Sequence, residues 1–206
     1  MSYQDIPRPT AARGIVRTLS QYEELPLLRD HLLRLDRESR YDRFHGFMDD
    51  GFIERYAEKC ACDGTTIIAY LEDGMVRGAA ELHPSDQSPD SQPEIAFSVE
   101  AGLRRHGVGS TLFRKVIAEA RAKGYRSLRI TTGAQNEAMR ALANKFGAHL
   151  TFRHGESTGS IDLNQRAQPE PARLAIATPF DAARAIVNFN REYWKLLQRM
   201  YGGRAA

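Results

Sequence analysis

The sequence predicts one main domain of mixed α+β fold, and three observations indicate it. Its 206 residues are 42% hydrophobic and 27% charged, which is the composition of a soluble globular protein and enough for a core. Segments of alternating hydrophobicity, typical of strands, are interleaved with segments of helical periodicity. Their order, β-α-α-β-β-β-α-β-α-β-β, fits neither a doubly wound parallel sheet nor a β-sandwich.

The first half of the chain predicts a strand, two helices and a hairpin. The segments concerned are 14–19, about 21–37, 50–60, and 65–71 with 75–82. Ser20 is a candidate N-cap for the first helix, although Pro26 in its first turns favours a later start. Asp73-Gly74 supplies the positive φ that a tight hairpin turn requires.

The second half predicts a strand, a helix, a strand, a helix and a second hairpin. These fall at 94–99, 108–124, 126–132, 137–146, and 149–152 with 160–163. We expect a flexible lead at 1–12, one domain over 13–164, a linker with three prolines at 165–180, and an amphipathic helix at 181–206. That last segment holds the whole net charge of +3, and its apolar half predicts packing across a homodimer interface, with an anionic membrane surface as the alternative.

Several classes of function are disfavoured by composition. No window is apolar enough for a membrane span and no apolar signal core opens the chain, so a cytoplasmic protein is expected. A net charge of +3 is too small to argue for nucleic acid. Cys60 and Cys62 are spaced for neither a disulfide nor a complete zinc site, and the histidines lack metal-ligand spacing, so reduced thiols and no metal are expected.

The segment from Val99 to Ser110 carries the strongest functional signal. A predicted strand feeds a glycine-rich turn that opens a helix, and Gly107 and Gly109 have no Cβ to keep a ligand from the backbone. Free N–H groups and the positive end of the helix dipole suit a pyrophosphate, and Arg104 and Arg105 add charge. Plain turn chemistry is the competing interpretation, because a dinucleotide fold needs a third glycine and a phosphate loop needs Gly-Lys-Ser/Thr.

This segment resembles motif A of the GNAT superfamily of acyl-CoA-dependent acyltransferases, and Asn136 to Gly147 resembles its motif B. Ser39 to Gly46 and Glu94 to Val99 are similar to stretches of Pat-type protein lysine acetyltransferases. Together the resemblance covers roughly 13–164. It implies a GNAT fold with a mostly antiparallel sheet whose fourth and fifth strands splay apart to admit acetyl-CoA. The cofactor-binding residues that it implies are Phe97, Val99, Arg104, Arg105, His106, Gly107, Val108, Gly109, Ser110, Asn136 and Met139.

The chemistry implied by the resemblance needs a base, an oxyanion donor and a route for the thiolate. Glu94 is the candidate base, with Glu81 as runner-up, and the backbone N–H near Val99 is the candidate oxyanion donor. Glu100 is expected at the surface of the turn, and Ser98 and Thr132 are interpreted as ordinary strand residues.

One position departs from the pattern that the resemblance implies. Ala143 stands where many family members have the tyrosine that protonates the thiolate. Tyr70 or Tyr125 is a substitute only if the fold brings one of them near.

The sequence therefore favours an N-acetyltransferase that uses acetyl-CoA and an amine acceptor. A protein lysine is the first choice of acceptor and a small amine or polyamine the second. The missing tyrosine keeps open a rival of another class, a non-catalytic acyl-CoA-binding regulatory module.

Overall fold

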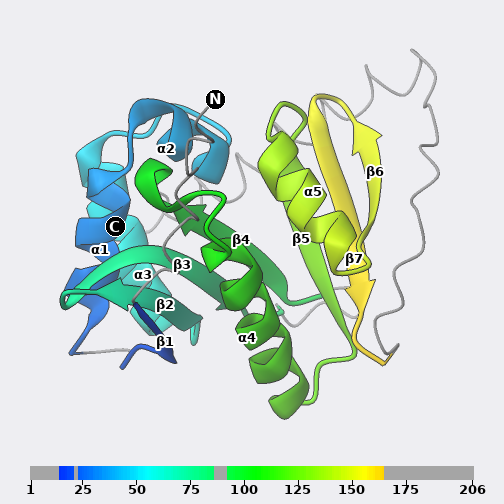
Figure 1. Cartoon of the computed structure of the whole chain (residues 1–206), viewed down its shortest axis with the longest axis horizontal. Helices are drawn as coiled ribbons and strands as arrows, with labels where there is room; N and C mark the ends of the chain where they lie inside the picture. The colour runs from blue at the N-terminus through cyan, green and yellow to red at the C-terminus, as the bar shows by residue number, and fades with distance from the viewer. Residues whose placement is uncertain (1–13, 21–22, 86–91, 165–206) are drawn as a thin grey trace, which may run out of the picture.

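A seven-stranded sheet in the order β1-β2-β3-β4-β5-β7-β6 forms the centre of the fold (Figure 1). The computed structural model describes residues 14–20, 23–85 and 92–164. Within them every neighbouring pair of strands is antiparallel except β4 and β5, which are parallel. The strands are β1 (Ile15–Thr18), β2 (Thr66–Glu72), β3 (Met75–His83), β4 (Glu94–Val99), β5 (Ser127–Gly133), β6 (His149–Arg153) and β7 (Glu156–Asp162). The expected mixed α+β fold is confirmed.

The helices lie in two layers, one on each face of the sheet. They are α1 (Leu25–Arg34), α2 (Arg37–Phe44), α3 (Asp50–Cys62), α4 (Val108–Ala122) and α5 (Glu137–Lys145), with a short 3₁₀ turn at Ala101–Leu103. Successive strand residues point to opposite faces, so Ile67 packs with α1 and α3 while Ile68 packs with α4 and α5. Alternation along each central strand thus builds two cores back to back.

The helix expected at about 21–37 is in fact two shorter helices. Pro26 sits in the first turn of α1, which begins at Leu25 without a side-chain cap, so Ser20 is not its N-cap. The chain leaves the helical path at Leu35, and the carboxylate of Asp36 accepts the backbone N–H of Ser39 at 2.8 Å to start α2. The segment 39–46, for which no element was expected, therefore lies mostly in a helix.

The second hairpin is longer than expected, because β7 starts at Glu156 rather than at residue 160. Its first residues, Glu-Ser-Thr-Gly, have little strand propensity of their own. They are held by pairing on both sides, with β5 and with β6. A Cβ at Gly159 would overlap the carbonyl of His149, so only glycine allows the two strands to pair there.

The remaining expectations concern the cysteines, membrane spans and the two ends of the chain. Cys60 is a buried free thiol and Cys62 an exposed one. No helix within the described ranges is long and apolar enough to cross a membrane. The expected lead at 1–12, linker at 165–180 and C-terminal helix at 181–206 lie outside the described residues.

Candidate active site

The β4–β5 gap, meaning the stretch beyond Ile95 and Ile130 where these two strands no longer pair, is the central feature of the site. Only Glu94↔Arg129 and Ile95↔Ile130 are in register. On the other side of β4, the N–H of Glu100 donates to the carbonyl of Arg77 at 3.0 Å. Alternate residues of an antiparallel strand bond to the same neighbour, so the N–H groups of Phe97 and Val99 point away from β3 and into the gap.

The turn after β4 presents the N-terminus of a helix beside this gap. Arg105 and Gly107 have φ angles of 66° and 85°, and α4 begins at Val108 with no side chain capping its first turn. Uncapped N–H groups at the positive end of a helix dipole form an anion site. Gly107 is needed for its backbone angle, whereas a Cβ at Gly109 would come within 3.3 Å of Leu142 of α5. Gly109 therefore allows the two helices to approach.

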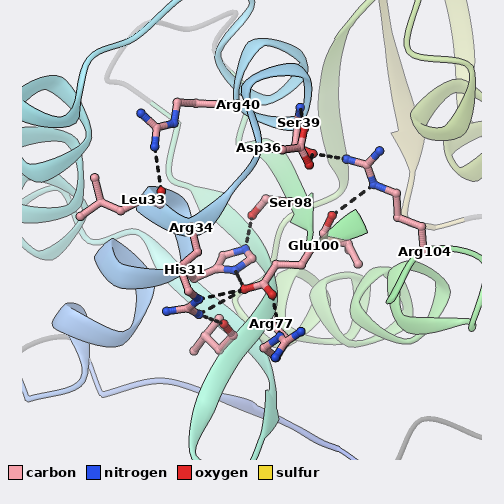
Figure 2. Close-up of polar contacts among 12 residues, drawn as sticks. His31, Leu33, Arg34, Asp36, Ser39, Arg40, Arg77, Ser98, Glu100 and Arg104 are labelled. Carbon is pink, nitrogen blue, oxygen red and sulfur yellow. Dashed lines mark hydrogen bonds and ion pairs between the residues drawn. The ribbon is translucent and has the colours of Figure 1, made fainter. Parts of the chain in front are cut away.

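Arg104, which the sequence placed among the cofactor-binding residues, forms hydrogen bonds within the protein. Its guanidinium donates to the hydroxyl of Ser39 and, at 3.3 Å, to the carbonyl of Val99 (Figure 2). It therefore joins the turn to the N-terminal end of α2. Arg105 and His106 are exposed.

Sequence reasoning missed a cation at this helix terminus. The Nζ of Lys145, in the last turn of α5, donates to the hydroxyl of Ser110 at 3.0 Å. Its charge thus stands at the first turn of α4. No local pattern shows that the C-terminal end of α5 meets the N-terminal end of α4, because only the fold brings them together.

Glu100, expected at the surface, anchors the end of β4. Its side chain is 14% exposed and pairs with Arg77 at 2.6 Å and Arg34 at 3.2 Å (Figure 2). The buried ring of His31 lies 3.4 Å from the same carboxylate and 2.9 Å from the hydroxyl of Ser98. Burial would raise the pKa of Glu100, but the bond to His31 and the two guanidinium charges outweigh it and lower the pKa.

Glu94 and Glu81, the two candidate bases, are in different surroundings. Glu94 is half-buried at the paired end of β4, opposite His83 of β3. Glu81 is fully buried, pairs with Arg43 at 2.7 Å and accepts the hydroxyl of Tyr56. Burial alone would raise the pKa of Glu81, but the charge of Arg43 outweighs it and holds the pKa well below its usual range. A carboxylate held so firmly as an anion is a poor base, which leaves Glu94 as the candidate.

A family model described as Acetyltransferase (GNAT) family matches residues 29–148, more than half of the chain. The chain belongs to the GNAT acetyltransferase family.

Solved structures show the same fold at identities below 25%. The GNAT domain of S. lividans PAT has a TM-score of 0.61 and 20% identity over 72% of this chain and 90% of that one. The protein yncA from Salmonella typhimurium, solved with its cofactor acetyl-CoA, has a TM-score of 0.56 and 17% identity over 77% and 99%. Ribosomal-protein-alanine N-acetyltransferase from Brucella melitensis has a TM-score of 0.55 and 20% identity over 72% and 99%.

In this GNAT fold, solvent does not reach the position where the tyrosine is missing. Ala143 lies on the inner side of α5 and is fully buried in the core. The hydroxyl of Tyr70 accepts the N–H of Gly14 at 2.8 Å, and its strand β2 is separated from the gap by β3 and β4. Tyr125 follows the far end of α4, whose 15 residues place it about 22 Å from the helix N-terminus. Neither tyrosine replaces the acid.

The remaining GNAT motif residues lie on α5. Asn136 is the N-cap of this helix, because its side-chain oxygen accepts the N–H of Met139 at 2.9 Å. Met139 packs against the core cluster below. Among the described residues no cluster of histidine, cysteine and carboxylate side chains is arranged to hold a metal ion.

Proposed function

We propose that this chain transfers the acetyl group of acetyl-CoA to a primary amine, and that the amine is a lysine side chain of a protein. The observation that carries the proposal is the direction of the Phe97 and Val99 amides. They face a gap that has a helix N-terminus at one end and Glu94 at the other. An amide at that place is a donor for the oxygen of a thioester as negative charge develops on it.

Acetyl-CoA would bind on the α4 and α5 side of the gap. The uncapped first turn of α4, with Lys145 and the exposed Arg105, supplies donors and positive charge for its pyrophosphate. Phe97 offers its backbone amide to the cofactor arm, Val99 keeps its amide for the reacting carbonyl, and Asn136 and Met139 stand at the opposite wall. The family assignment supports this mode of binding, as do solved relatives of the same fold that carry acetyl-CoA or coenzyme A.

A charge change at Ser110 tests the pyrophosphate site. Ser110 is the third residue of α4, where an aspartate favours the helix itself but would repel an anion and neutralise Lys145. Ser110→Asp is expected to weaken acetyl-CoA binding at least tenfold, or about 1.4 kcal/mol, by calorimetry. Ser110→Asn introduces a side chain of nearly the same shape as aspartate but without its charge, so it should bind acetyl-CoA within a few-fold of the wild type. Equal acetyl-CoA affinities of the two variants would contradict a pyrophosphate site at this helix terminus.

The chemistry follows from groups on the two faces of the sheet. Glu94 lies on the same face of β4 as Ser98, which is the face covered by α1, and the acceptor amine would approach from there. Its carboxylate takes the amine proton, directly or through water, while nitrogen attacks the carbonyl carbon. The N–H of Val99 then holds the oxyanion until the bond from carbon to sulfur breaks.

A protein acceptor is favoured by the segment that resembles Pat-type enzymes. Residues 39–46 form most of α2, whose C-terminal His45 lies 3.0 Å from Glu156 at the start of β7. This contact crosses the gap on the face of the sheet that α1 covers, which is called the acceptor face because the amine would approach from it. One structure of similar fold, the ribosomal-protein-alanine N-acetyltransferase, carries a protein acceptor in its name, although the residue named there is alanine rather than lysine.

An amine panel separates the proposal from its rival, the non-catalytic acyl-CoA-binding module that the buried Ala143 favours. Free thiol released from acetyl-CoA is measured with lysine-containing peptides, polyamines and no acceptor. Stimulation by peptides supports the proposal, stimulation by polyamines alone moves the acceptor to small amines, and binding without turnover supports the module. A cytoplasmic homodimer stays a prediction alongside this function.

A further inference from the structure

Thr132 of β5 carries a buried hydroxyl that has no hydrogen-bond partner among the described residues. The residue is 2% exposed, and its Oγ1 is not accessible to water. Buried polar side chains are nearly always hydrogen-bonded, so an unpaired hydroxyl at a candidate active site calls for a ligand. The inference drawn from it rests on the proposed function.

The position of Thr132 along β5 places it at the β4–β5 gap. The last paired residues are Ile95 and Ile130, and two further residues along each strand are Phe97 and Thr132. If the parallel register is continued, these two residues face each other across the place where the strands have separated. Thr132 therefore stands two residues past the last strand pair, level with the backbone amide of Phe97 that points into the gap.

The side chain of Thr132 also lies on the cofactor face of the sheet. Leu128 and Ile130, at even spacing before it, belong to the core cluster beneath α4 and α5. Ala143, at the position of the missing acid, is part of the same cluster. A leaving group that departs on the α4 and α5 side would thus pass the hydroxyl of Thr132.

Apolar side chains dominate on that face. Phe97 stacks on Phe113 with ring centroids 4.9 Å apart, and Phe113 stacks on Phe146 at 4.3 Å. These rings carry no nitrogen or oxygen that could accept a hydrogen bond from a hydroxyl. A charged sulfur in the same place would gain more from one hydrogen bond than it would in water, because the surroundings screen charge poorly.

We propose that the Thr132 hydroxyl donates a hydrogen bond to the sulfur of the acetyl-CoA thioester and stabilises the thiolate as it leaves. The nitrogen–carbon bond forms, the carbon–sulfur bond breaks, and its electron pair stays on sulfur. The amine proton goes to Glu94 and then to solvent, while Thr132 keeps its own proton. The hydroxyl thereby takes over part of the role of the absent tyrosine, by stabilising charge rather than by giving up a proton.

A binding cycle tests the proposal without an acceptor. The affinities of coenzyme A and of desulfo-coenzyme A, in which hydrogen replaces the thiol, are measured by calorimetry at pH 9 for the wild type and for Thr132→Val. At this pH the free thiol, with an ordinary pKa of about 8.5, is mostly ionised. Thr132→Val should weaken coenzyme A about three- to tenfold, the worth of one hydrogen bond, and leave desulfo-coenzyme A unchanged.

The neighbouring residue supplies a matched control. Thr131 also has an unpartnered buried hydroxyl, but it points to the other face of the sheet. Thr131→Val should show no difference between the two ligands, whereas Thr132→Ser, which retains the hydroxyl, should keep the preference for coenzyme A. Equal effects of Thr132→Val on both ligands, or none on either, would overturn the proposal.

Thermal unfolding separates a ligand role from a structural one. Valine has the shape of threonine, so removing an unpaired hydroxyl should leave Thr132→Val at least as stable as the wild type. A clear loss of stability would mean that the hydroxyl serves the fold, and the inference would fail. If the wild-type protein binds neither ligand, the proposed function itself fails, and this result is distinct from a missing sulfur preference.

Discussion

Replacing Glu94 with glutamine is expected to lower kcat by 10²–10⁴, the usual range for the loss of a general base. Glutamine keeps the size of the side chain at the paired end of β4 but cannot accept a proton from the amine. Affinity for acetyl-CoA should stay nearly unchanged, because Glu94 lies on the face of β4 away from α4 and α5. The measurement is steady-state thiol release at saturating acetyl-CoA, with calorimetry of binding alongside.

A second glutamate on the sheet controls for the loss of charge alone. Glu72 ends β2, two strands away from the gap, and Glu72→Gln should keep the wild-type kcat. If Glu94→Gln turned over at the wild-type rate at neutral pH, the base would have to be solvent, since the burial and ion pair of Glu81 do not suit it for that role.

Replacing Glu81 with glutamine is expected to destabilise the fold by about 3–5 kcal/mol, because it leaves the charge of Arg43 buried without a partner. Arg43 and Glu81 are 8% and 0% exposed, so water does not compensate for the loss. Their ion pair fastens α2 to β3 beneath the acceptor face. Denaturant unfolding of the wild type and the variant gives the difference directly.

A double variant isolates the ion pair from the packing around it. Arg43→Met together with Glu81→Leu removes both charges, so it should recover most of the stability lost in Glu81→Gln. What is not recovered would come from Tyr56, whose hydroxyl loses its acceptor. A single variant as stable as the wild type would show that the pair contributes nothing to the fold.

The same pair sets an expected pH dependence. Because the folded state lowers the pKa of Glu81, its contribution is complete above the ordinary pKa of about 4.3 and is lost as pH falls towards the folded value. The wild type should therefore lose stability below about pH 4.5 more steeply than the uncharged double variant. Parallel curves for the two proteins would contradict this assignment.

The sequence predicts what is local in this fold. The strand, turn and helix around Gly107 were recognisable because alternation, glycine and helical periodicity follow one another within 30 residues. Helix α2 was not, since Arg-Glu-Ser-Arg-Tyr-Asp-Arg-Phe has no apolar stripe. It is held by contacts with distant parts of the chain, such as Arg104 to Ser39 and Arg43 to Glu81.

The candidate site likewise contains some residues that local sequence patterns identify and others that only the fold brings together. Glu94 and the glycine-rich turn were found from sequence, whereas the link from Lys145 to Ser110 depends on two helix ends that meet only in the fold. Arg104 was chosen for its charge, and only the structure shows that its guanidinium also donates to Ser39 of α2. Thr132 looked like an ordinary strand residue because a missing hydrogen-bond partner leaves no trace in a sequence.

The separation of β4 from β5 also creates a strand edge inside the sheet. Unpaired backbone along a strand is a template for another strand, and β-sheet proteins usually cover such edges or confine them to the periphery, where β1 and β6 lie here. In this chain the N–H groups of Phe97 and Val99 leave such an edge open in the interior, and the proposed function uses them. If acetyl-CoA binds there as proposed, the amides of its arm would occupy the place of the missing strand. We therefore expect cofactor occupancy to lower the tendency of this edge to pair with another chain.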